Sequence, residues 1–82
     1  MDQEIKFFCY EGDSGFTVTL EPEGMTYEVK EKNEIKFKAK NTNQEFYWSC
    51  RHESSGIQVF PDTPRGYSGV EVYKNGDIID TF

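Results

Sequence analysis

The feature that most constrains this fold is a strict two-residue alternation that runs from Glu34 to His52. Apolar side chains alternate with lysines over residues 34–40, and an apolar and polar alternation resumes over residues 46–52 after a short polar segment. Because successive side chains of a strand point to opposite faces, each run predicts a strand with one apolar face. Closing the polar segment as a loop would put apolar residues opposite each other, for example Phe37 opposite Trp48. The sequence therefore predicts a β-hairpin over 34–52.

The rest of the chain repeats this pattern in shorter pieces. We expect further strands over residues 4–10, 16–20, 25–30, 57–60, 70–73 and 78–81, separated by turns rich in Gly, Pro, Asn and Ser. Asn75-Gly76 favours a two-residue type I′ turn, which pairs Tyr73 with Ile78 and Val72 with Ile79. No stretch has the apolar stripe of a helix. The 82 residues are therefore predicted to form a single domain over 1–82, all-β, a small antiparallel β-sandwich or barrel of about seven to eight short strands with no substantial helix.

Residues 26–43, TYEVKEKNEIKFKAKNTN, resemble an early hairpin of cupredoxin-like domains, in which an extended strand, a turn and an alternating strand follow one another. A blue-copper site needs two histidines, a cysteine and usually a methionine from a late loop. This chain has one histidine, His52, and its methionines, Met1 and Met25, lie early. The resemblance therefore implies no copper site and no function.

The two cysteines and the histidine are the obvious candidates for metal ligands. Cys9 and Cys50 both have the inward parity of their predicted strands, so we expect free, buried thiols; a single disulfide is the alternative in an oxidising compartment. Cys50 and His52 are two residues apart, and Cys9 could complete a three-ligand set for zinc or copper. No paired spacing such as CxxC supports that set, so we expect no metal and no cofactor.

Catalytic machinery is not indicated by the sequence. His52 is the only histidine, and no nucleophile motif surrounds the serines near it. Glu71 and Asp80 would face each other across the terminal hairpin, where like charges are expected to splay into water. Phosphate-binding glycine motifs are absent. We therefore expect a protein that is not an enzyme and has no catalytic residues.

The charge is uneven along the chain. The net charge is −6, and residues 1–34 hold nine acids against three bases, while residues 35–82 hold six of each. A negative surface repels nucleic acid and anionic membranes and attracts basic proteins. The chain opens with Met-Asp-Gln-Glu, which has no signal-peptide pattern, and no apolar run is long enough to span a membrane. We expect a cytoplasmic protein without membrane contact.

Thirteen aromatic residues are more than a core of this size requires, so some are expected to be contact residues at the surface. The predicted partner-binding residues are Tyr10, Glu21, Glu23, Phe60, Arg65, Tyr67 and Tyr73. We expect a non-enzymatic protein-binding module, in its sharpest form an acidic inhibitor or immunity-type protein that neutralises a basic, nucleic-acid-acting protein.

Two alternatives remain open from the sequence. One is a nucleic-acid binder whose outward hairpin face would carry Lys36, Lys38, Lys40, Tyr47 and Arg51, since cations interleaved with aromatic rings suit single strands. Glu34 and Glu45 at the two ends of that face, together with the acidic chain, weigh against it. The other is a structural or self-associating domain, with a homodimer as its simplest form.

Overall fold

The computed structural model describes residues 1–61 and 66–82. Within these ranges, eight short strands form two four-stranded sheets that pack as a sandwich, and no residue is helical, which confirms the predicted all-β fold. No helix in the described ranges is therefore long and apolar enough to cross a membrane. The strands are β1 (Gln3–Phe8), β2 (Phe16–Leu20), β3 (Met25–Val29), β4 (Glu34–Lys40), β5 (Trp48–Glu53), β6 (Gly56–Pro61), β7 (Gly69–Lys74) and β8 (Asp77–Thr81).

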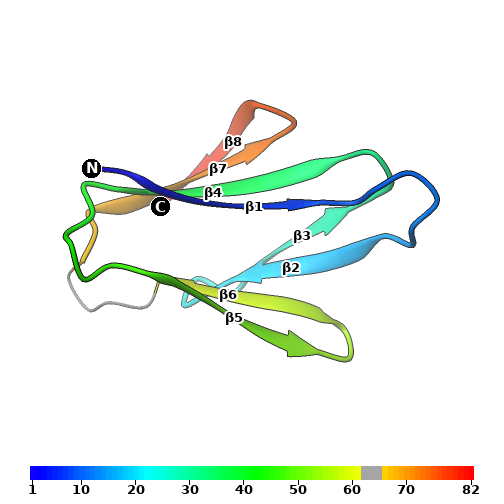
Figure 1. The fold of residues 1–82 in the computed structure, drawn as a ribbon, viewed down its shortest axis with the longest axis horizontal. Coiled ribbons are helices and arrows are strands. Elements are labelled where there is room, and N and C mark those ends of the chain that lie inside the picture. The colour runs from blue at the N-terminus through cyan, green and yellow to red at the C-terminus, as the bar shows by residue number, and fades with distance from the viewer. Residues whose placement is uncertain (62–65) are drawn as a thin grey trace.

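The two sheets form the upper and lower layers in Figure 1. Sheet A has the strand order β1-β4-β7-β8, and all its pairs are antiparallel. Sheet B has the order β3-β2-β6-β5, in which β2 and β6 run parallel and the other pairs antiparallel. The strands β2–β3, β5–β6 and β7–β8 form hairpins within one sheet, and the remaining connections cross between the sheets. The expectation of purely antiparallel pairing is therefore wrong at β2–β6.

The predicted hairpin over 34–52 is not formed. β4 pairs with β1 and β7 in sheet A, whereas β5 pairs with β6 in sheet B. The inward face of β4 is as predicted, with Phe37 fully buried. Alternation identifies the apolar face of a strand, but both sheets of a sandwich face the same core, so alternation does not say to which sheet a strand belongs. Residues 26–43 do not form the cupredoxin-like hairpin either, because β3 and β4 lie in different sheets.

The core lies between the sheets and centres on Phe37. The rings of Phe7, Tyr27 and Trp48 surround it, with centroid distances of 6.4, 5.8 and 6.3 Å to the Phe37 ring. The other members of the buried cluster are Cys9, Val18, Leu20, Val29, Ile35, Val59, Val70 and Val72. All but Cys9 lie on strands, and they come from both sheets, which is how two inward apolar faces close a sandwich.

Two side chains tie the sheets together at their edges. Tyr27 of β3 donates its hydroxyl to Asp80 Oδ2 of β8 at 2.8 Å. On the other side of the sandwich, Trp48 Nε1 of β5 donates to the Gln3 carbonyl of β1 at 3.1 Å. Each bond joins an edge strand of sheet B to an edge strand of sheet A, so these two bonds help to close the sandwich at its sides.

Gly56 begins β6 beside β2 and requires a glycine. Its φ is +149°, and a Cβ at this position would collide with Thr17. Thr17 Oγ1 donates to the neighbouring Ser55 carbonyl at 2.6 Å. The missing side chain therefore lets the β5–β6 turn approach β2, where the parallel pairing begins.

The terminal hairpin keeps its predicted turn but not all of its register. Tyr73 is opposite Ile78, as expected from Asn75-Gly76. A register shift beyond this pair places Val72 opposite Asp80 instead of Ile79, and Glu71 opposite Thr81. The predicted opposition of Glu71 and Asp80 is therefore wrong, because one extra residue in β8 moves all later pairs by one position.

Both cysteines are free thiols, as predicted, but only Cys9 is buried. The Cys9 Sγ lies 3.4 Å from the Ser14 carbonyl oxygen, within the loop that follows β1. Cys50 is exposed because β5 is an edge strand whose inward face is not covered beyond Trp48.

Candidate protein-binding surface

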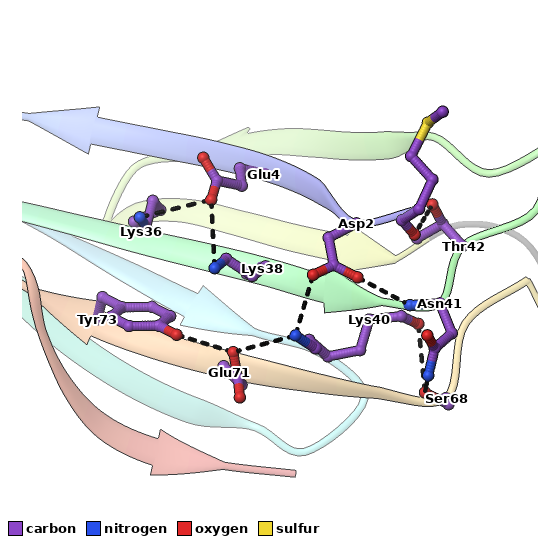
Figure 2. A network of polar contacts seen from close by, with 11 residues as sticks. Asp2, Glu4, Lys36, Lys38, Lys40, Asn41, Thr42, Ser68, Glu71 and Tyr73 are labelled. Carbon is purple, nitrogen blue, oxygen red and sulfur yellow. Dashed lines mark hydrogen bonds and ion pairs between the residues drawn. The ribbon is translucent and has the colours of Figure 1, made fainter.

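The outer face of sheet A carries the lysines of β4, each paired with carboxylates from the neighbouring strands (Figure 2). Glu4 of β1 lies 3.5 Å from Lys36 Nζ and 3.7 Å from Lys38 Nζ. Lys40 Nζ lies 2.9 Å from Asp2 and 3.8 Å from Glu71. The sheet register produces these contacts, since Glu4 and Glu71 stand opposite Lys38 on its two sides.

Tyr73 and the chain start extend this set of contacts. The ring of Tyr73 lies 4.6 Å from Lys36 Nζ and 5.1 Å from Lys38 Nζ, and its hydroxyl donates to Glu71 at 2.8 Å. These are cation–π contacts that hold the lysine amines against the sheet. The hydrogen bond from Lys40 holds the pKa of the Asp2 carboxyl below its usual range, and Asp2 in turn raises the pKa of Lys40.

We call this group of charges the sheet A network. It comprises Asp2, Glu4, Lys6, Glu34, Lys36, Lys38, Lys40 and Glu71. Its four acids and four bases cancel. The described residues outside it carry ten acids and four bases, and the charges of Asp62 and Arg65, which lie outside the described residues, also cancel. The whole net charge of −6 therefore belongs to surfaces other than the sheet A network.

Four of the predicted partner-binding residues lie on segments at one end of the sandwich, which we call the acidic end (Figure 1): Glu21 and Glu23 in the turn between β2 and β3, Phe60 near the end of β6, and Tyr67 just before β7. Glu21 accepts a hydrogen bond from Gln58 Nε2 at 2.7 Å, and its backbone N–H donates to the Val59 carbonyl at 2.9 Å, next to Phe60. Burial raises the pKa of Tyr67, and the negative charge of Glu23 adds to this effect. The Tyr67 ring packs against the core, with its centroid 5.8 Å from that of Phe46. The acidic end therefore combines two carboxylates with two half-buried rings.

The other predicted partner-binding residues lie elsewhere. Tyr73 belongs to the outer face of sheet A, where it contacts lysines. Tyr10 lies in the loop between β1 and β2, and that loop is at the opposite end of the sandwich from the β2–β3 turn (Figure 1). Tyr10 is 68% exposed, and its ring contacts Phe8 at a centroid distance of 4.9 Å. Arg65 lies outside the described residues. The structure therefore places the segments of four of the seven residues at one end of the sandwich, and Tyr10 and Tyr73 elsewhere.

The alternative nucleic-acid face is not assembled as predicted. Arg51 lies on β5 in sheet B, and Tyr47 directly precedes that strand, whereas the three lysines lie on β4 in sheet A. The predicted common face of these five residues required the 34–52 hairpin, which is not formed; nucleic-acid binding itself stays a prediction. The lysines that remain on a common face are paired with carboxylates, which reduces their attraction for phosphate.

A metal site is not indicated in the described part of the chain. Within residues 1–61 and 66–82, no three His, Cys, Asp or Glu side chains form a group that could hold a metal ion. His52 and Glu53 line a groove of about 380 Å³ with Gly15 and Phe16, but Cys9 and Cys50 do not line it. The groove gives no reason to assign a reaction or a cofactor.

One exposed apolar region, on β8, was not expected from the sequence. Ile78 is 51% exposed and Ile79 is 45% exposed. A signal for this was present in the sequence, because two consecutive strand residues point to opposite faces and cannot both enter one core. At least one of the two isoleucines had to lie outside the core.

The chain matches no protein-family model, no curated protein and no solved structure.

Proposed function

We propose that this protein is a non-enzymatic protein-binding module that neutralises a basic, nucleic-acid-acting protein by occupying its cationic surface. The charge distribution carries this proposal. The cations of β4 pair with carboxylates inside the sheet A network, so the excess of six negative charges is presented by the remaining surface. A surface of this kind offers carboxylates to the same lysines and arginines that would otherwise bind phosphate.

The acidic end is the part of that surface best suited to a specific contact. Glu21 and Glu23 supply charge for long-range attraction, which mainly raises the rate of association. Phe60 and Tyr67, on segments at the same end of the sandwich, are half-buried and supply apolar contact area without needing to be ordered on binding. Charge and rings together favour a protein partner over a simple counterion.

The proposal is tested by isolating the partner and measuring its activity. The tagged protein is used to capture binding proteins from its native host, and each captured protein is purified and checked for basic character and for nuclease or nucleic-acid-binding activity. We expect this protein to suppress that activity at a stoichiometric ratio and to lose the complex in high salt.

Two double charge reversals distinguish the acidic end from net charge. Glu21→Lys with Glu23→Lys changes the acidic end, and Asp13→Lys with Glu28→Lys makes the same change in net charge at exposed positions elsewhere. We expect the first pair to weaken binding by about tenfold or more and the second to weaken it less. A captured partner that is acidic, or one whose activity is unchanged in the complex, would contradict the proposal.

A further inference from the structure

β8 is the open edge of sheet A. In the described part of the chain it pairs with β7 on one side only, and the last residues of the chain continue that pairing. The Phe82 N–H donates to the Val70 carbonyl at 2.8 Å, and the Val70 N–H donates to the Phe82 carbonyl at 2.9 Å. In an antiparallel ladder such mutually bonded residues alternate with residues whose N–H and C=O groups point away. The main-chain groups of Thr81 therefore face the open edge, where another strand could bond to them.

The side chains of β8 make this edge attractive to a partner strand. Ile79 has no opposite residue in the β7–β8 register, and it is exposed together with Ile78. β8 contains no Lys, Arg or Pro, the residues that commonly protect sheet edges from pairing. The edge strands β1 and β5 carry Lys6 and Arg51, whereas the edge strand β3, like β8, contains none of these residue types.

The charges around β8 indicate the chemistry of the missing strand. Asp77 and Asp80 are the charged residues of β8, and both are acids. Tyr27 of β3 donates a hydrogen bond to Asp80 of β8, so β3, which directly follows the turn that holds Glu23, lies on the same side of the sandwich as β8. A strand with lysine or arginine side chains added beside β8 would lie next to the carboxylates of Asp77 and Asp80.

A second copy of this chain fits the same edge poorly. Antiparallel pairing of β8 with its copy would bring the Asp77 and Asp80 carboxylates of both molecules together. Each molecule also carries a net charge of −6. Like charges across a strand pair destabilise it, whereas opposite charges stabilise it.

We propose that β8 is a docking edge that accepts an extended, basic segment of the partner as an additional strand of sheet A. This inference rests on the proposed function and states where and how the partner binds. Main-chain hydrogen bonds along β8 would supply affinity, while the isoleucines and the surrounding carboxylates would select apolar and basic side chains in the added strand.

The test uses two labelled synthetic peptides of about eight residues, a typical strand length. One alternates lysine with valine, and the other alternates lysine with glycine, so that both have the same charge but only the first favours a strand. Fluorescence anisotropy measures binding to the wild type and to Thr81→Pro, Ile79→Lys and Tyr47→Lys. Hydrogen exchange then measures protection of the β8 amides.

Thr81→Pro removes an N–H from the open edge without changing any charge. Ile79→Lys places a cation on the edge through an exposed side chain, so it tests the edge even if the proline variant does not fold. Tyr47→Lys makes the same change of charge at an exposed position that directly precedes β5.

We expect the lysine–valine peptide to bind the wild type and to protect the Thr81 amide. Thr81→Pro and Ile79→Lys should each weaken binding by about tenfold or more, and Tyr47→Lys should weaken it much less. Equal binding of the lysine–valine peptide to all variants, or no binding to the wild type while a captured basic partner still binds, overturns the docking edge and leaves the proposed function intact. A wild-type dimer that Ile79→Lys dissociates would identify a second copy as the occupant and would also overturn the inference. Failure of the peptides and of every captured basic protein overturns the proposed function itself.

Discussion

Replacing Tyr27 with phenylalanine should measurably loosen the β3–β8 side of the sandwich. The hydroxyl of Tyr27 donates to Asp80 Oδ2 at 2.8 Å. This hydrogen bond joins side chains of the two sheets. A hydrogen bond to a charged group contributes about 1.5–3 kcal/mol to stability. Asp80 is only half-buried and can recover water, so we place the loss near the low end, at about 1.5 kcal/mol. For a domain of this size, that lowers Tm by about 6–12 °C.

The matched control for Tyr27→Phe is Tyr73→Phe. Tyr73 also donates its hydroxyl to a carboxylate at 2.8 Å, but its acceptor is Glu71 on the same strand. We expect Tyr73→Phe to lower the free energy of unfolding by no more than about 0.5 kcal/mol, as is usual for surface substitutions. Urea unfolding followed by tryptophan fluorescence measures both variants. If Tyr27→Phe costs no more than Tyr73→Phe, the bond between the sheets does not stabilise the edge.

The same variant has a signature at alkaline pH. Burial, followed by the hydrogen bond to Asp80, raises the pKa of Tyr27 in the folded protein. A group whose folded pKa lies above its unfolded value stabilises the protein below the unfolded pKa, and that contribution is lost as pH rises. We therefore expect wild-type stability to fall above about pH 10, the pKa of an unfolded tyrosine, and to fall less steeply in Tyr27→Phe. Identical alkaline slopes would contradict the assignment.

Three further predictions concern other parts of the molecule. Lys40 holds the pKa of the Asp2 carboxyl below its unfolded value, so the stabilisation that this pair gives is lost as pH falls. Asp2→Asn should therefore make the loss of stability below about pH 4 less steep. Unfolding curves at several acidic pH values measure this. A thiol reagent should modify the exposed Cys50 in the folded protein and the buried Cys9 only on unfolding, and equal rates at both thiols would be inconsistent with the fold. Phe37→Ala should cost about 3–5 kcal/mol, measured by chemical unfolding, because its ring is fully buried among three others.

The positions of the strands could be predicted from the sequence, but their partners could not. β4 has the bounds 34–40 that its lysine alternation indicates, and its inward residues are buried as expected. The same alternation in β5 suggested a hairpin, yet residues 41–47 cross to the other sheet instead. Contacts far apart in sequence hold that crossing: the Thr42 N–H and hydroxyl both donate to the Met1 carbonyl, at 2.6 and 2.8 Å. No local sequence pattern predicts contacts between residues so far apart in the chain.

The terminal hairpin shows where local chemistry is sufficient. Asn75 has a φ of +50° and Gly76 a φ of +89°, so the turn requires residues that tolerate positive φ, and the sequence supplies them. The extra residue that shifts the later register has no such local signature. It follows from the whole sandwich, in which Asp80 turns inward to meet Tyr27 of the opposite sheet.

The candidate site was predictable in composition but not in arrangement. The sequence alone shows an acidic excess and a lysine alternation, and it suggested that the lysines could form a free basic face. Only the pairing of β1 and β7 with β4 shows that Glu4 and Glu71 stand opposite Lys38. The balance of charge on sheet A therefore depends on the strand order, which could not be predicted from the sequence.

The central claim is that the acidic surface outside the sheet A network binds a basic protein. Its most direct test is the dissociation constant of the complex with the purified partner, measured by titration calorimetry between about 50 and about 200 mM salt. We predict that the affinity of the wild type falls by about tenfold or more across this range, because screening weakens the attraction between exposed charges. The affinity of the Glu21→Lys, Glu23→Lys variant should fall less steeply with salt. A dissociation constant that does not change with salt, or equal slopes for both proteins, would contradict the claim.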